Sequence, residues 1–490
     1  MTMNSNGRVN PGRLLAVLLA GQFMANVDTA IVNVAAPSIR TGLSASGGEL
    51  QLVVSGYILT YAMLLVTGAR LGQMRGYRRM FMIGLGLFTL ASLACGLAPS
   101  APALILARIV QGTGAAMMVP QVLSGIQLNF PGPERARAIG LYAVALSGGA
   151  VAGQVLGGLI VSANLFGATW QPVFLINVPI GLVLMAAAAR FLPADQQRSA
   201  QRLDLAGVAT LSIAVLLAIV PLILGRDQSW PGWTWVSLIA SVPAVLVFIT
   251  IERRVAAQGR DPLVNLQLLA RPAIAWGLVA FGAAGSTYFS MLFVLALYLQ
   301  QGLDKTPLYS GLALVSWVAA FGLAGPLLRR LPAARVPLFA PVGSLVLAGS
   351  YLGIGLSVMG GTPSGSLLIA LLGLGGLGLG LGFSAIVAHI TNSVPERYAP
   401  DASGLITTIS QITAAAGIAI FGTLYLSLVA MPGPGPAMQA FSIVNAAFAV
   451  TAFLAAAAAY VSIRRSSTHV PQQAIPATAT QRMATSPTEA

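Results

Sequence analysis

Long apolar runs, separated by short charged or Pro/Gly-rich breaks, repeat along the whole 490-residue chain. A helix that crosses a membrane needs about 20 predominantly apolar residues, and about fourteen such runs can be counted. The pattern therefore predicts an all-α polytopic membrane protein with about 14 transmembrane helices. The runs begin near Leu14, Leu50, Met80, Ala103, Arg137, Pro172, Leu203, Trp233, Ala273, Leu308, Val336, Ser366, Ala402 and Ala440.

Composition supports the membrane interpretation and excludes a soluble globule. Hydrophobic residues make up 56% of the chain and charged residues 8%, with a mean hydropathy of +0.83, whereas soluble domains are about 25% charged. The net charge of +14 does not indicate nucleic-acid binding, because most basic residues lie in short breaks between apolar runs. One cysteine, Cys95, and two histidines exclude an intramolecular disulfide and predict no metal site.

The arginines are distributed unequally between alternate breaks. The odd-numbered breaks contain only Arg40, Arg226 and Lys305, and Arg108 lies inside a span. The termini and the even-numbered breaks hold the other 22 basic residues. Basic residues mark cytoplasmic loops, so the pattern predicts that both termini are cytoplasmic. A miscount of one helix would destroy this asymmetry.

Two arginine-rich breaks resemble each other and suggest an internal repeat. Residues 68–79 and residues 322–335 both leave a span through small residues and enter a tight basic turn, eight spans apart. Many secondary transporters consist of duplicated halves with a binding site between them, although two unrelated basic loops would also explain the pattern. We expect a cytoplasmic N-terminus (1–13), a six-helix half (14–192), two linker helices (203–251), a second six-helix half (272–463) and a disordered cytoplasmic tail (464–490).

Several motifs occur in an order that resembles the major facilitator superfamily, and specifically its fourteen-span drug:proton antiporter branch. The 68–79 loop is similar to the cytoplasmic signature of the superfamily, and residues 28–37 are similar to the first-span motif of the branch. Residues 106–114 match the fourth-span motif, and residues 149–158 match the fifth-span antiporter motif. Further matches lie at residues 170–181, 204–207, 261–263 and 402–417.

The resemblance implies a cytoplasmic gating loop, with two departures from the family pattern. Gln73 stands where the family has an Asp that latches the outward-facing state, and Tyr77 stands where an Arg is expected. Gln73 can form hydrogen bonds but carries no charge, so we expect a weaker latch. The residues assigned to this loop are Gly68, Arg70, Gly72, Gln73, Gly76, Arg78 and Arg79.

The fifth-span motif places small residues on one helix face. Gly149, Gly153 and Gly157 recur every four residues, which aligns them, and such faces allow close helix contact in membranes. This face could seal the protein against proton leak, or could simply serve packing. Gly158 completes the motif, and Gln154 replaces the family's Pro, so the resemblance does not extend to the proline-linked bend.

Two charges inside the spans are the candidate coupling residues. Asp28 lies about fifteen residues into the first span. Insertion of a carboxylate at that depth costs about 2.5–3.5 kcal/mol. Asp28 either carries a proton and substrate or is a permanently paired structural acid. Arg108, with Gln111 one turn on, lies in the fourth span and cannot deprotonate. The family pattern links this Arg to proton translocation; snorkelling to the outer interface is the alternative.

Polar and aromatic residues of other spans are candidates for lining a cavity. We name Asn33, Tyr57, Asn177 and Gln411, although helix packing would explain them equally well. No Asp or Glu lies deep in the second-half spans. This absence favours a neutral or weakly charged organic substrate.

The resemblance implies a proton-coupled exporter of hydrophobic or amphipathic compounds that works by alternating access. We expect a monomer in a bacterial cell membrane, with lipophilic small molecules and protons as partners, no nucleic-acid partner, and no cofactor beyond the proton gradient. A high Arg, Ala and Gly content is typical of GC-rich bacteria, where the cargo could be an antibiotic and the role self-resistance. The alternatives are a superfamily transporter of another substrate class, such as an amino acid or siderophore exporter or an uptake symporter, and a membrane enzyme or sensor. The sequence contains no enzymatic motif, so an enzyme is not expected.

Overall fold

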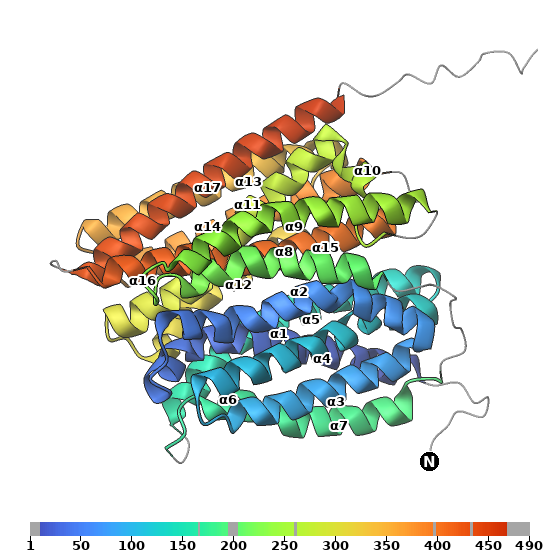
Figure 1. Cartoon of the computed structure of the whole chain (residues 1–490), viewed down its shortest axis with the longest axis horizontal. Helices are drawn as coiled ribbons and strands as arrows, with labels where there is room; N and C mark the ends of the chain where they lie inside the picture. Colours follow the sequence, from blue (N-terminus) through green and yellow to red (C-terminus); the bar gives the residue numbers. More distant parts are fainter. Residues whose placement is uncertain are drawn as a thin grey trace, which may run out of the picture.

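A computed structural model describes residues 10–164, 167–194, 204–258, 262–394, 398–431 and 435–467 of the chain, and these residues are almost entirely helical (Figure 1). Within this part of the chain, fourteen helices are long and apolar enough to cross a membrane. The predicted number of spans is therefore confirmed. Most of the predicted N-terminal segment and the tail from residue 468 lie outside the described residues.

The helices fall into three groups along the chain. The first half, as we call it, contains α1 (Pro11–Gly42), α2 (Gly47–Arg75), α3 (Tyr77–Gly96), α4 (Ala101–Asn129), α5 (Gly132–Ala163), α6 (Gln171–Leu175) and α7 (Asn177–Phe191). The linker pair is α8 (Leu205–Leu224) and α9 (Gly232–Ala257). The second half contains α10 (Leu266–Leu269), α11 (Pro272–Leu297) with η1 (Tyr298–Gly302), α12 (Pro307–Leu328), η2 (Ala333–Leu338), α13 (Phe339–Met359), α14 (Ser366–Asn392), α15 (Ala399–Gly417) with η4 (Ile418–Gly422) and α16 (Thr423–Val429), and α17 (Pro436–Ser467).

Local sequence signals set the ends of these helices. Ser46 and Glu49 form a capping box at the start of α2, each side chain accepting a hydrogen bond from the other's backbone N–H. Gly76, at φ 99° and ψ 138°, separates α2 from α3. Only glycine adopts such a positive φ without strain. This turn holds the basic loop at one end of the bundle.

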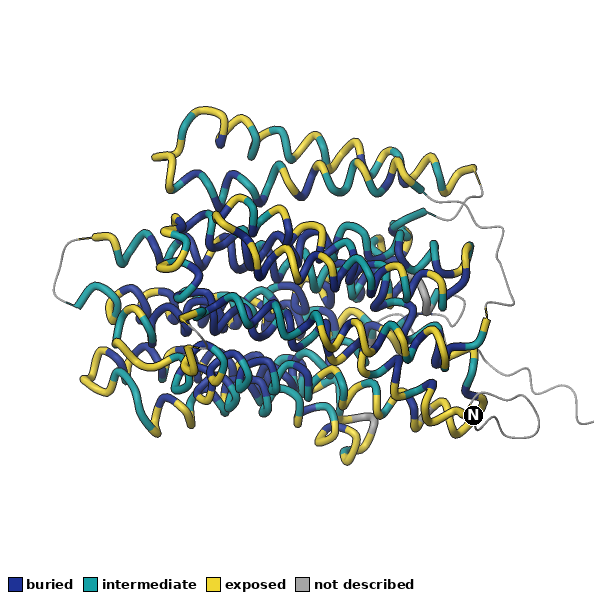
Figure 2. The backbone as a smooth tube through the Cα atoms, turned by 90° about the horizontal axis from the view of Figure 1, so that it is seen from below, coloured by how far each residue is buried: buried dark blue, intermediate teal, exposed yellow. Residues whose placement is uncertain are grey.

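Helices of each half pack mainly against helices of the same half. In the first half α1 packs on α5, and α4 packs on both α2 and α3; in the second half α13 packs on α14 and α17, and α12 packs on α14. The halves meet where α5 contacts α12 and where α2 contacts α15. The linker pair lies along α2 and η4, and α9 is the least buried span, with 11% of its apolar stretch enclosed. Figure 2 shows the buried segments gathered in the middle of the molecule.

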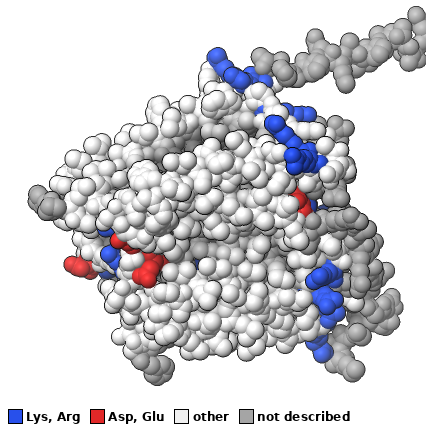
Figure 3. Space-filling model, in the orientation of Figure 1, with Lys and Arg blue, Asp and Glu red and all other residues white. Residues whose placement is uncertain are grey.

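The two ends of the bundle differ in charge. Figure 3 shows most basic side chains of this face gathered at the end where the described chain begins, and most visible acidic side chains, with a few basic ones, at the opposite end. We call the first of these the arginine-rich end; it carries the turn between α2 and α3, the start of α1 and the end of α7.

Candidate functional site

Asp28 of α1 is the centre of a buried polar network that joins three helices. Its Oδ2 accepts a hydrogen bond of 2.6 Å from Nη1 of Arg108 on α4, which is also an ion pair. Its Oδ1 accepts hydrogen bonds from Nε2 of Gln111 at 2.8 Å and from Nδ2 of Asn177, on α7, at 2.9 Å. All four side chains are at most 1% exposed. The predicted coupling residues are thus in direct contact, and Asn177 joins them.

The guanidinium of Arg108 lies inside the bundle and not at an interface. Its Nε donates to the carbonyl of Val53 at 3.1 Å, and its Nη1 also donates to Oε1 of Gln111 at 2.7 Å. The Tyr57 ring centre is 4.3 Å from its central carbon, and the Phe174 ring centre is 5.7 Å away. These contacts with two π faces stabilise a desolvated cation. The guanidinium of Arg108 is therefore enclosed by other side chains and backbone of the first half.

Two further residues of the network were not predicted. The Oγ of Ser92, on α3, accepts hydrogen bonds from Nε2 of Gln111 at 2.7 Å and from Nδ2 of Asn177 at 3.4 Å. The Sγ of Cys95 lies 3.7 Å from Oε1 of Gln111. Both residues are buried. Their spacing of three places them on one face of α3, but nothing in the sequence indicated which helix that face meets.

Glycines of the fourth-span motif allow the network to form. A Cβ at Gly112 would lie 2.6 Å from the carbonyl oxygen of Tyr57, and a Cβ at Gly114 would lie 2.6 Å from the backbone nitrogen of Phe88. Small residues permit such backbone contact between membrane helices. The motif thus holds α4 against both α2 and α3, and this approach positions Arg108 and Gln111 beside Asp28.

Every neighbour that hydrogen-bonds the Asp28 carboxylate is a donor. Arg108, Gln111 and Asn177 supply these hydrogens. An all-donor setting suits an ionised carboxylate, because the O–H of a protonated carboxyl would face another donor. Removal of either member of a buried ion pair leaves the other charge uncompensated.

The described residues hold no group of three His, Cys, Asp or Glu that could bind a metal ion.

The gating-loop residues pack α2 onto α4 and reach two other segments. A Cβ on Gly68 would clash with the carbonyl oxygen of Ala116 on α4. A Cβ on Gly72 would clash with the side-chain amide of Gln121 on the same helix. Nη2 of Arg70 donates to the carbonyl of Pro262 at 2.8 Å, between the linker pair and the second half. Gly76 makes the turn into α3 described above.

The remaining loop residues lie at the surface of the arginine-rich end. Nη2 of Arg78 donates to the carbonyl of Ala189 at 2.6 Å, in the last turn of α7. Gln73 and Arg79 are exposed, and the Gln73 side chain has no hydrogen-bond partner among the described residues. The weaker latch expected at Gln73 stays a prediction, because the side chain makes no latch contact in this conformation.

The fifth-span glycines form two contacts on different sides of α5. A Cβ at Gly149, Gly153 or Gly157 would lie 2.6–3.1 Å from its nearest atom on α1. A Cβ at Gly158 would lie 2.9 Å from the Cα of Leu308 on α12. Gln154 is fully buried and neither atom of its amide has a hydrogen-bond partner within the described part of the chain.

The cavity candidates divide into three environments. Tyr57 covers Arg108, and Asn177 binds Asp28, as described above. Asn33 is buried and donates to the carbonyl of Thr29 at 3.0 Å in its own helix. Gln411 lies on α15, which packs against α2 at the junction of the two halves.

Hydrogen bonds between the halves gather at the end opposite the arginine-rich loops. Nη1 of Arg40 donates to Oε1 of Gln301 at 2.9 Å, and Nε2 of Gln300 donates to the carbonyl of Val34 at 3.0 Å. At the same end, the N–H of Leu308 donates to Ser162 Oγ at 3.1 Å and Thr423 Oγ1 donates to Gln51 Oε1 at 3.2 Å. We call this the closed end.

Comparison with known proteins decides the family. The family model described as Major Facilitator Superfamily matches residues 18–418. The chain belongs to the major facilitator superfamily. This superfamily consists of transporters and not of enzymes, and the chain is accordingly a multi-pass membrane protein.

Relatives of this superfamily member include antibiotic exporters. A probable actinorhodin transporter of Streptomyces coelicolor is 35% identical over 85% of this chain and 72% of its own. A cephamycin export protein of Amycolatopsis lactamdurans is 35% identical over 84% of both chains. A tetracenomycin C resistance and export protein of Streptomyces glaucescens is 30% identical over 87% of this chain and 78% of its own.

Solved structures of superfamily transporters share the fold. A bacterial homologue of the human lysosomal transporter Spinster, inward-facing and unoccupied, superposes with a TM-score of 0.67 at 17% identity, covering 94% of this chain and 99% of the other. A peptide transporter in complex with sulfate gives a TM-score of 0.67 at 16% identity, covering 94% and 97%.

Proposed function

We propose that this protein exports hydrophobic or amphipathic organic compounds, antibiotics among them, in exchange for protons. The observation that carries the proton coupling is the buried Asp28–Arg108–Gln111–Asn177 network. Insertion of a carboxylate into a membrane span is expensive, and intramembrane acids mark ion and proton pathways. Relatives that carry named antibiotics support the substrate class.

Protonation of Asp28 would change the network without dispersing it. Because all its hydrogen-bonding neighbours are donors, proton uptake requires at least one of them to move away. Arg108 stays charged and keeps the Val53 carbonyl, the Gln111 amide oxygen and the Tyr57 ring as partners. We propose that this loss of the ion pair, and its return on proton release, couples the proton to the movement of the helices.

The orientation and the conformation form part of the proposal. With arginine-rich loops in the cytoplasm, both termini lie inside the cell and the closed end faces outward. The bonds from Arg40 to Gln301 and from Thr423 to Gln51 then keep the outer side shut. The single chain carries both halves, and we propose that the monomer is the working unit.

Proton release from acid-loaded everted membrane vesicles tests this function. Addition of lipophilic antibiotics to wild-type vesicles is expected to release protons from the lumen, and the Asp28→Asn variant is expected to show no release. Asp304→Asn is the matched control, since Asp304 is exposed outside the spans and should keep wild-type release. Release by Asp28→Asn equal to wild type would remove Asp28 from the coupling path. No release by wild type with any compound would contradict the export of this substrate class.

A further inference from the structure

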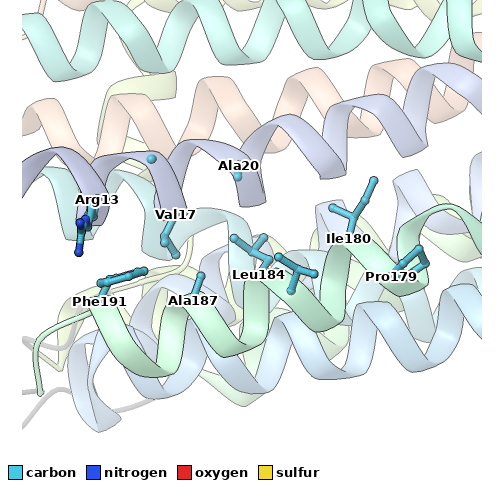
Figure 4. A pocket seen from close by; sticks show the side chains of 10 residues that line it. Arg13, Val17, Ala20, Pro179, Ile180, Leu184, Ala187 and Phe191 are labelled. Atoms are coloured by element: carbon cyan, nitrogen blue, oxygen red, sulfur yellow. The ribbon is translucent and has the colours of Figure 1, made fainter. Parts of the chain in front are cut away.

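A groove of about 560 Å³ runs along the outside of the first half between α1 and α7 (Figure 4). Arg13 and Phe191 lie at one end of it, and Pro179 and Ile180 lie at the other. Apart from Arg13, every lining residue is Ala, Val, Leu, Ile, Pro or Phe. The groove lies outside the Asp28 network and is not used by the proposed export mechanism.

The groove has the length of one bilayer leaflet. From Pro179 to Phe191 helix α7 rises by about 18 Å, and half of the hydrocarbon core of a bilayer is about 15 Å. Ala16 and Ala20 of α1 and Ala187 of α7 line the groove, and these small side chains leave the space open. Ile180 and Val183 on its edge are exposed. The space therefore suits an extended hydrocarbon chain in contact with surrounding lipid.

The end of the groove at the membrane surface carries two cations. The guanidinium carbons of Arg13 and Arg190 lie 5.4 and 6.0 Å from the centre of the Phe191 ring. Both arginines are exposed, and the ion pairs found among the described residues include neither of them. The groove thus combines an apolar channel with a positively charged mouth. This combination matches the acyl chain and the phosphate of an anionic phospholipid, since basic pockets between spans bind such headgroups.

We propose that this groove binds an anionic phospholipid of the bilayer, with one acyl chain between α1 and α7 and its phosphate at Arg13 and Arg190. A zwitterionic lipid would place its own cation beside these two guanidiniums and would bind more weakly. The orientation proposed above assigns the site to the cytoplasmic leaflet. The lipid chemistry follows from the groove alone, so the site can exist even if the proposed export activity is wrong.

Native mass spectrometry of the full-length protein, titrated with phosphatidylglycerol or phosphatidylethanolamine, tests the proposal. We expect wild type to retain one phosphatidylglycerol more tightly than phosphatidylethanolamine. Arg13→Gln/Arg190→Gln is expected to weaken phosphatidylglycerol binding by about tenfold or more, since each basic residue near an anionic surface contributes a several-fold gain. Ala20→Phe/Ala187→Phe, which fills the groove and keeps both charges, is expected to release the tightly held lipid.

Arg464→Gln is the matched control. Arg464 is exposed at the arginine-rich end of α17 and its guanidinium carbon lies 4.8 Å from the Tyr460 ring centre, but it is not among the residues that line the groove between α1 and α7. This variant should bind phosphatidylglycerol as wild type does. Equal affinity for both lipids, unchanged binding in either double variant, or displacement of the lipid by a transported antibiotic at this groove would each overturn the proposal. The displacement result would identify the groove as a substrate entry site.

Discussion

A carboxylate, a guanidinium and two amides form the buried polar network to which we assign the proposed proton coupling. Asp28 and Arg108 are oppositely charged, fully buried and 2.6 Å apart. Their mutual attraction is strong in this environment, but it is offset by the large free-energy cost of desolvating both charges. The pair therefore contributes little net stability, and its main effect is to fix how the helices are arranged.

A double-mutant cycle separates the coupling role of this pair from its structural role. Asp28→Asn or Arg108→Gln alone leaves one buried charge unpaired and is expected to destabilise the protein by about 3–5 kcal/mol. Asp28→Asn/Arg108→Gln removes both charges and should recover much of the lost thermal stability. Transport should stay abolished in all three variants, because no titrating group remains paired with a fixed cation. Antibiotic-driven proton release and thermal melting in detergent give the two readouts.

Two results of the double-mutant cycle would contradict the proposed role of the Asp28–Arg108 pair. Transport by the neutral double variant at near wild-type rate would show that Asp28 and Arg108 hold the helices together and do nothing more. Equal melting temperatures for the single and double variants would contradict the charge-pair account of stability.

Contact between α1 and α5 depends on the absence of side chains along one face of α5. Gly153 packs on Val27 and Ala30 of α1, one residue before and two residues after Asp28. We expect a seam packed this closely to hinder the passage of water and protons between the two helices. The linker pair acts at another seam: Asp227, in the turn between α8 and α9, accepts a hydrogen bond of 2.7 Å from the N–H of Gly48 at the start of α2.

Gly153→Ala is expected to disrupt the seam. The new Cβ would lie 2.6 Å from the Cβ of Ala30, so α1 and α5 must separate, at a cost of about 1–3 kcal/mol. We expect a lower melting temperature and substrate-independent proton leak across reconstituted vesicles.

The matched control for this substitution is Gly140→Ala in the same helix. A Cβ there meets nothing within 4 Å, and alanine favours the helix by about 1 kcal/mol. This variant should be as stable as wild type or more so, without leak. Equal leak from the two variants would show that the α1–α5 seam is not a proton barrier.

Across the whole molecule, the hydrogen bonds at the closed end join the two halves in addition to the packing of α5 on α12 and of α2 on α15. The π-helical turns η1 and η4 lie at this end, and Gln300, Gln301 and Thr423 come from these turns or directly follow them. Single π turns inside α-helices frequently occur at functional sites. Alternating access requires these bonds to break and the opposite end to close.

Cross-linking at the closed end should stop transport. Arg40→Cys/Gln301→Cys, treated with a membrane-impermeant bifunctional thiol reagent on intact cells, is expected to lose most export, because the outer side can no longer open. The native Cys95 is buried and should not react. Each single cysteine variant with the same reagent serves as the control.

Two results would contradict this view of the closed end. Normal export after complete cross-linking would show that the closed end need not open. Cross-linking only in everted vesicles, and never in intact cells, would reverse the proposed orientation.

The chain determines by itself how many helices cross the membrane and where they begin, because each span is selected by its own local hydropathy and each loop by its turn and charged residues. The fourteen expected starts correspond to fourteen candidate spans. Sequence also singled out Asp28, Arg108 and Gln111, since charged and amide side chains in apolar runs are costly and hence conspicuous.

Only the tertiary structure decided what those residues touch. Asn177 is 149 positions from Asp28, and Ser92 lies on a helix whose facing direction depends on the glycines of α4. Hydropathy is nearly the same all round a buried membrane helix, so its pattern does not specify which face meets which neighbour. The network at Asp28, the closed end and the groove at Arg13 arise from packing between distant segments, and packing is a property of the folded whole.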